Sequence, residues 1–147
     1  MFLYEAAAMV VLFMVVLLAQ RKKHPDGDTM ALFLLLYGCV QVVLESLRND
    51  SHMLLIHFVR VNQVGALVLA VAVIIRWTVT AVCGKTCTGK KAGLLWALII
   101  ISIGLGICME FAVDRLGEPL LSYGMMALAL ALIAWCGLRF RRMANKV

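Results

Sequence analysis

Charged side chains are scarce in this sequence. Asp, Glu, Lys and Arg together make up 15% of the residues, whereas soluble domains contain about a quarter. Hydrophobic residues account for 64%, and the mean hydropathy is +0.99. A water-soluble fold of 147 residues has too little interior to hide so much apolar surface. The composition therefore excludes a soluble globular domain and indicates a membrane protein.

Two further absences limit the kind of membrane protein that the sequence can encode. No Lys or Arg precedes the first apolar run, and Glu5 stands near its start. A cleavable signal peptide has a positively charged first region, so we expect this apolar run to stay in the mature protein. None of the five cysteines lies in a loop that we place on the outer side of the membrane, so we expect no disulfide framework.

Long apolar segments fill most of the chain. Each is close to the ~20 residues that a helix needs to cross a bilayer core. We therefore predict an all-α, polytopic integral membrane helix bundle with five transmembrane helices, forming a single membrane domain over residues 1–147. The segments are Leu3–Ala19, Met30–Leu47, Val64–Val82, Ala92–Ala112 and Leu120–Leu138.

Positive charge is distributed unevenly between the two sides of this bundle. When the chain is threaded through the membrane, only Arg48, Arg60 and Arg115 of the 14 basic residues fall on one face. Short loops rich in Lys and Arg stay in the cytoplasm. We therefore expect the N-terminus outside and the C-terminus inside. Since these loops explain the net charge of +6, we expect no nucleic-acid partner.

The second apolar segment carries the best candidate site. Tyr37, Gln41, Glu45 and Arg48 follow one another at spacings of four, four and three residues, which places them on one helical stripe. Polar and ionisable groups inside a membrane are costly and mark functional sites by default. Further polar residues fall at the predicted outer helix ends: Tyr4, Glu5, Asn62, Gln63, Glu110, Asp114 and Tyr123. They indicate a polar cluster near the outer leaflet. The alternative is that they are ordinary interfacial residues, which keep the helix ends in contact with water.

Several of these residues occur in a recognisable order. Leu3-Tyr4-Glu5 opens an apolar helix that ends in Arg-Lys-Lys and a Pro-Asp-Gly turn. After it come Leu36-Tyr37-Gly38, then Glu45 with Arg48 one turn later, and then Gln63 at the head of the next span. This order resembles the last three helices of the bacterial prolipoprotein diacylglyceryl transferases. The resemblance covers residues 1–75, and residues 76–147 add two transmembrane helices and a basic tail.

The resemblance implies an activity and its residues. Enzymes of this family transfer the diacylglyceryl group of phosphatidylglycerol to the lipobox cysteine thiol of a prolipoprotein at the outer leaflet. By this likeness Glu45 and Tyr4 would be catalytic, and Arg48, Gln41, Tyr37 and Gln63 would bind lipid. Gln41 stands where the family has an arginine, so it would supply neutral hydrogen bonds only. No cofactor and no metal are implied.

The likeness also implies a location, a bacterial plasma membrane, and it implies partners. We expect phosphatidylglycerol, a prolipoprotein signal peptide, and a separate chain that supplies the N-terminal elements of the family. If the chain is enzymatic, it is a phosphatidylglycerol–prolipoprotein diacylglyceryl transferase that is incomplete by itself. The alternative is a non-catalytic small multipass protein, either a complex subunit or a lipid-binding scaffold.

Weaker signals have ordinary explanations. His52 and His57 could act as bases, but surface histidines are common. Cys83 and Cys87 could bind metal or form a redox pair, yet a zinc site needs four ligands. Glu110 and Asp114 could hold a cation or simply cap a helix end beside Arg115.

Overall fold

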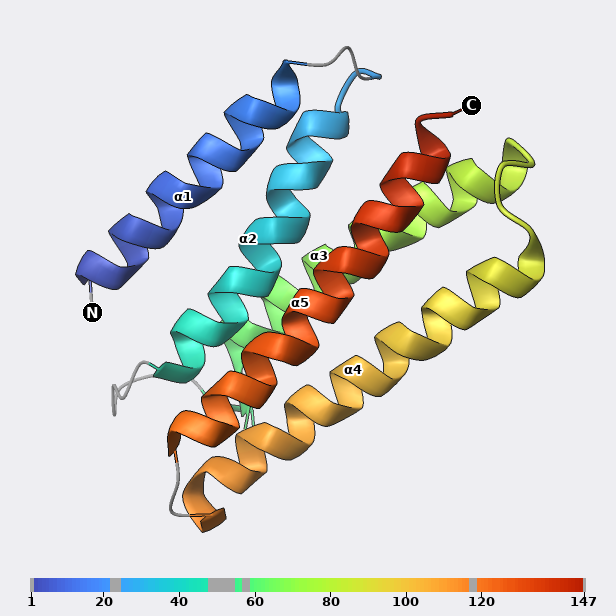
Figure 1. Cartoon of the computed structure of the whole chain (residues 1–147). Coiled ribbons are helices and arrows are strands. Elements are labelled where there is room, and N and C mark those ends of the chain that lie inside the picture. The colour runs from blue at the N-terminus through green and yellow to red at the C-terminus, as the bar shows by residue number, and fades with distance from the viewer. Residues whose placement is uncertain (1, 22–24, 48–54, 57–58, 117–118, 147) are drawn as a thin grey trace. The chain divides into compact units, whose positions relative to one another are not determined.

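The computed structural model describes residues 2–21, 25–47, 55–56, 59–116 and 119–146, and within these it contains five α-helices and one short antiparallel strand pair (Figure 1). Leu55 pairs with Arg60, and Ile56 pairs with Val59. The elements are α1 (Phe2–Gln20), α2 (Asp28–Leu47), β1 (Leu55–Ile56), β2 (Val59–Arg60), α3 (Val61–Cys83), α4 (Gly89–Leu116) and α5 (Pro119–Ala144).

The helical prediction is confirmed, and its number of spans is supported in part. Among the described residues, four helices contain a stretch long and apolar enough to cross a membrane, while the apolar stretch of α1, Glu5–Gln20, is shorter. A fifth span and the orientation of the bundle therefore stay predictions. The strand pair is a small departure from an all-α fold. The four stretches are Asp28–Glu45, Val61–Cys83, Gly89–Met109 and Leu121–Ala144.

Large apolar side chains are exposed along these helices. Leu94 and Ile101 of α4 are 65% and 66% exposed, and Val68 of α3 is 60% exposed. In water such surfaces would drive aggregation, whereas acyl chains solvate them without penalty. The exposed surface is that of a multi-pass membrane protein.

Local chemistry sets where α2 begins. Gly27 has a φ of 80°, a conformation that glycine adopts without steric penalty, and it turns the chain into the helix. The backbone N–H of Asp28 donates to the carbonyl of Pro25 at 3.1 Å, and the N–H of Ala31 donates to that of Gly27. The carboxylate of Asp28 lies in the first turn, where the helix dipole favours negative charge.

The contacts divide the chain into an N-terminal unit, Met1–Val73, and a C-terminal unit, Ile74–Val147. In the N-terminal unit α1 packs against α2, and α2 meets α3 at Gly38. A Cβ atom on Gly38 would lie only 2.6 Å from the carbonyl oxygen of Ala66 and 3.1 Å from the Cβ of Ala70. The absence of a side chain at residue 38 therefore permits the close approach of the two backbones.

In the C-terminal unit α4 and α5 pack as an antiparallel pair (Figure 1). The rings of Trp96 and Phe140 lie 6.4 Å apart between their centroids, and Phe140 is fully buried. The indole N–H of Trp96 donates to the hydroxyl of Thr78 at 3.3 Å. These contacts fix α4 against α5 and against the end of α3.

Candidate functional site

The candidate site is built around a buried carboxylate. Glu45 lies in the last turn of α2 and is only 1% exposed. Burying a carboxylate costs free energy unless hydrogen-bond donors surround it. The buried side chain of Glu45 therefore requires hydrogen-bond partners. Those partners come in part from the following helix.

The first turn of α3 supplies amide groups to the last turns of α2. The side-chain amide of Asn62 donates to Oε1 of Glu45 at 3.5 Å. The side-chain amide of Gln63, which is 5% exposed, donates to the backbone carbonyl of Val42 at 3.5 Å. Both contacts are long for hydrogen bonds, so each is weak. They nevertheless fasten the start of α3 to the helix that carries Glu45.

Two more of the predicted residues lie on the same face of α2. Tyr37 and Gln41 are half-buried and precede Glu45 by two turns and one turn. The ring of Tyr37 stacks on that of Phe33, with centroids 5.7 Å apart and ring planes 20° apart. This stacking within one helix restricts the Tyr37 ring and leaves its hydroxyl as the group available for hydrogen bonding.

Several of the other predicted positions have no described side chain or lie outside the described residues. Arg48 is not among the described residues, and Tyr4 belongs to α1 without a described side chain. His52 and His57 also lie outside the described residues, and Glu110 and Asp114 lie in α4 without described side chains. Of the predicted set, the structure thus places Tyr37, Gln41, Glu45 and Gln63 along α2 and the start of α3.

The cysteines contribute no site in the described part. Cys83 is exposed and Cys87 is buried, and both are free. Among the residues that the structure describes, no group of three or more His, Cys, Asp or Glu side chains converges as a metal site would require.

Asn62 is the functional candidate that sequence reasoning did not assign. The sequence pattern identifies Asn62 only as one of several polar residues at the predicted outer helix ends. The available signal was its position directly before Gln63, in the first turn of a span, where side-chain amides readily reach a neighbouring helix.

The arrangement combines one acidic group with several neutral hydrogen-bonding groups. A carboxylate can act as a general base toward a nearby acid such as a thiol. Amide and phenol groups can orient ester or phosphate oxygens, because each carries at least one N–H or O–H donor. These groups can therefore accept a proton and form hydrogen bonds to oxygen-bearing ligands.

Comparisons with known proteins find relatives of the N-terminal half of the chain. The family model described as prolipoprotein diacylglyceryl transferase matches residues 1–79. The phosphatidylglycerol–prolipoprotein diacylglyceryl transferases of Streptococcus equi subsp. zooepidemicus strains MGCS10565 and H70 are each 37% identical to this chain over 76 residues, and that of Streptococcus equi subsp. equi strain 4047 is 36% identical. Each match covers 50% of this chain and 29% of the relative. No solved structure matches.

Proposed function

We propose a function from family membership: this chain belongs to the prolipoprotein diacylglyceryl transferase family, and we infer that it takes part in moving a diacylglyceryl group from phosphatidylglycerol to a lipobox cysteine. The buried Glu45 at the α2–α3 contact carries this inference, because it lies within the matched residues and offers a proton acceptor. The proposed location is a bacterial plasma membrane, with this site near the outer leaflet.

The reaction requires a nucleophile, a leaving group and a proton acceptor. The cysteine thiol loses its proton, and its sulfur attacks the glyceryl carbon that carries the phosphate ester. A C–S bond forms while the C–O bond to the phosphate breaks, and glycerol phosphate departs with the bonding electron pair. We assign the thiol proton to Glu45 and propose Tyr4 as a second catalytic group.

The other site residues would hold the lipid. Arg48 is the cation among them, and guanidinium groups bind phosphate oxygens through paired hydrogen bonds. Gln41, Tyr37 and Gln63 are neutral and would orient the headgroup through hydrogen bonds. Because Gln41 brings no charge, most of the phosphate stabilisation falls to Arg48.

The chain spans about 29% of the length of the curated relatives that it matches. The other parts of a complete transferase would therefore come from residues outside these 147, whether on the same polypeptide or on a separate chain. The prolipoprotein signal peptide would approach the site from within the bilayer.

A chimera tests the proposal directly. Residues 1–79 of this chain, which the family model matches, replace the corresponding segment of the streptococcal relative, and the chimera is expressed in a strain depleted of its own transferase. We expect a lipoprotein to gain the mass of a diacylglyceryl group. The same strain expressing the 147-residue chain alone shows whether these residues suffice.

The controls separate chemistry from assembly. The intact streptococcal enzyme must restore the adduct, and a fluorescent tag must show equal membrane levels of every protein. A chimera that inserts normally but gives no adduct would contradict the transferase proposal. That result would instead favour a non-catalytic subunit or a lipid-binding scaffold.

A further inference from the structure

The exposed face of α5 changes character along its length. Its exposed side chains follow one helical stripe at spacings of three, four or seven residues. The first part of this stripe is aliphatic, a tryptophan follows, and the end is cationic. We call these residues the α5 stripe: Leu121, Leu128, Leu132, Trp135, Arg139 and Arg142.

The aliphatic part of the stripe is long enough to lie along most of the hydrocarbon core of a bilayer. From Leu121 to Trp135 a helix rises about 21 Å, which is most of a hydrocarbon core of ~30 Å. The three leucines are 58%, 54% and 39% exposed, so acyl chains can reach them. Arg139 and Arg142 therefore lie beyond the aliphatic part, where lipid phosphates are found.

Trp135 and Arg139 have the chemistry typical of residues at a membrane–water boundary. Trp135 is 46% exposed, and tryptophan is enriched where a membrane meets water. The guanidinium carbon of Arg139 lies 4.8 Å from the centroid of the Trp135 ring. This cation–π contact holds the arginine over the indole, so its N–H groups are positioned at the level of the headgroups.

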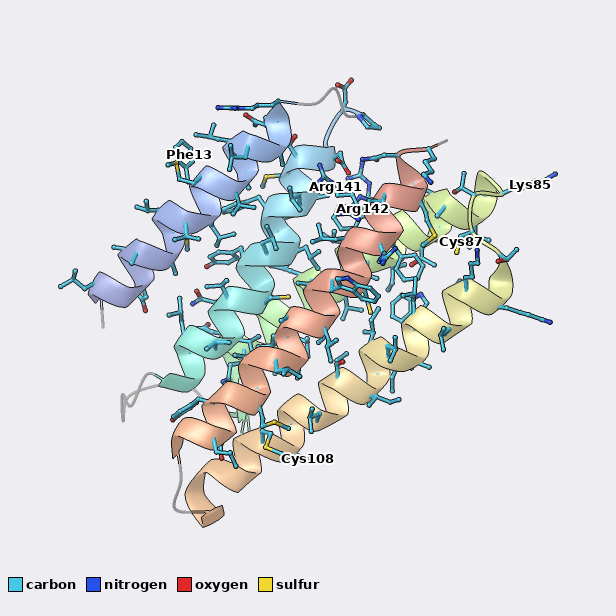
Figure 2. All side chains as sticks on the ribbon, viewed as in Figure 1. Phe13, Lys85, Cys87, Cys108, Arg141 and Arg142 are labelled. Carbon is cyan, nitrogen blue, oxygen red and sulfur yellow. The ribbon has the colours of Figure 1, made fainter. Side chains whose placement is uncertain are left out.

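The positive charge of the stripe is not balanced within its own helix. Residues 119–147 contain no Asp or Glu. The hydroxyl of Thr86 donates to the carbonyl of Met143 at 2.9 Å, which fastens the loop before α4 to the end of α5. Figure 2 shows Lys85 on that loop and the stripe residue Arg142 near the end of α5, so Lys85 adds a further cation at this end of the C-terminal unit.

We propose that the α5 stripe binds an anionic glycerophospholipid, with the acyl chains along Leu121 to Leu132 and the phosphate on Arg139 and Arg142. The charge complementarity and the interfacial tryptophan favour a lipid over a protein partner. This site lies outside residues 1–79, which the family model matches, and it does not depend on transferase activity.

Tryptophan quenching by brominated lipids tests the proposal on the full chain. The protein is reconstituted in vesicles that contain brominated phosphatidylglycerol or brominated phosphatidylcholine at equal mole fractions. Trp77 is 3% exposed and Trp96 is half-buried, so subtracting the signal of Trp135→Phe isolates Trp135. We expect Trp135 to prefer phosphatidylglycerol by about fivefold or more, since each cation near a membrane contributes about that factor.

Two charge variants provide the comparison. In the double variant R139Q/R142Q, brominated phosphatidylglycerol and brominated phosphatidylcholine should quench Trp135 almost equally. The double variant K90Q/K91Q removes the same charge from exposed residues of α4 and should leave most of the preference. Circular dichroism checks that both variants remain helical.

Either of two results would overturn the proposal. Equal quenching by the two lipids in the unaltered protein would show that the stripe has no headgroup preference. If K90Q/K91Q lost as much of the phosphatidylglycerol preference as R139Q/R142Q, then diffuse positive charge, rather than the stripe, would attract the anionic lipid.

Discussion

Glu45 combines two properties that oppose each other in a folded membrane helix. It is ionisable, and it is 1% exposed. The amide of Asn62 reaches one of its oxygens, and Glu45 makes at least one further interaction. Such residues are retained in membranes mainly where chemistry needs them, which is why Glu45 is the first position to test.

Replacing Glu45 by glutamine removes the proton acceptor with little change in shape. Because the introduced amide keeps an oxygen that can accept from Asn62, we expect normal membrane insertion. The rate of adduct formation in the chimera should fall by about 100-fold or more, the usual contribution of a general base. Mass spectrometry of the lipoprotein over time measures this rate.

Asp26→Asn is the matched control for this substitution. Asp26 is exposed and lies before the start of α2, at the opposite end of that helix from Glu45. The Asp26→Asn substitution should leave the rate of adduct formation unchanged. A Glu45→Gln chimera as fast as the Asp26→Asn chimera would remove Glu45 from the reaction.

At the scale of elements, the contact between α2 and α3 depends on Gly38. The nearest atom to an added Cβ is the backbone carbonyl oxygen of Ala66, at 2.6 Å. A backbone atom cannot move aside as the end of a flexible side chain can. The two helices must therefore separate if residue 38 gains a side chain.

Gly38→Ala should destabilise the protein by about 1–3 kcal/mol, as overpacking does in other tightly packed interiors. Denaturation in detergent micelles measures the free energy of unfolding. Gly104→Ala in α4 is the control, because no atom lies within 4 Å of an added Cβ there and alanine favours the helix by up to about 1 kcal/mol. Equal stability of the two variants would contradict the close approach.

The second element-scale contact joins the loop after α3 to the end of α5. Lys85 adopts a φ of 56°, the left-handed conformation that often ends a helix. The N–H of Thr86 then donates to the carbonyl of Ala81 at 3.0 Å. Its hydroxyl lies 3.0 Å from the same carbonyl and 2.9 Å from that of Met143.

Thr86→Val removes this hydroxyl and preserves the size of the side chain. We expect a loss of about 1–2 kcal/mol from the missing hydrogen bond and a looser end of α5. Trypsin should then cleave faster after Arg141 and Arg142. Thr80→Val is the control, since the hydroxyl of Thr80 donates to the backbone carbonyl of Arg76 within the same helix. An unchanged cleavage rate in Thr86→Val would contradict the role of the contact between Thr86 and Met143.

At the scale of the whole molecule, the placement of charge predicts the orientation in the membrane. Basic residues gather in the segments after the first, third and fifth apolar stretches, and such segments remain in the cytoplasm. This prediction also requires that α1 crosses the bilayer, although its described apolar stretch is short.

Reporter fusions test orientation and the fifth span together. Alkaline phosphatase, which is active only outside the cytoplasm, should be active after residue 50 and inactive after residues 25 and 147. Green fluorescent protein should give the opposite pattern. Phosphatase activity after residue 25 would show that α1 does not cross as predicted, and a cytoplasmic Glu45 end would remove the outer-leaflet site.

The sequence by itself determined that the protein is helical and apolar enough for a membrane, that it has a place in the transferase family, and that Tyr37, Gln41 and Glu45 share one face of α2. These properties are local, because transfer free energy depends on composition and the helical period fixes which residues align.

Only the tertiary structure decided that Asn62 contacts Glu45, that Gly38 meets Ala66, and that Thr86 joins α5. Each of these contacts depends on the rotation and register of one helix against another. Side-chain packing between helices sets those quantities, and neither hydropathy nor spacing along the chain encodes them.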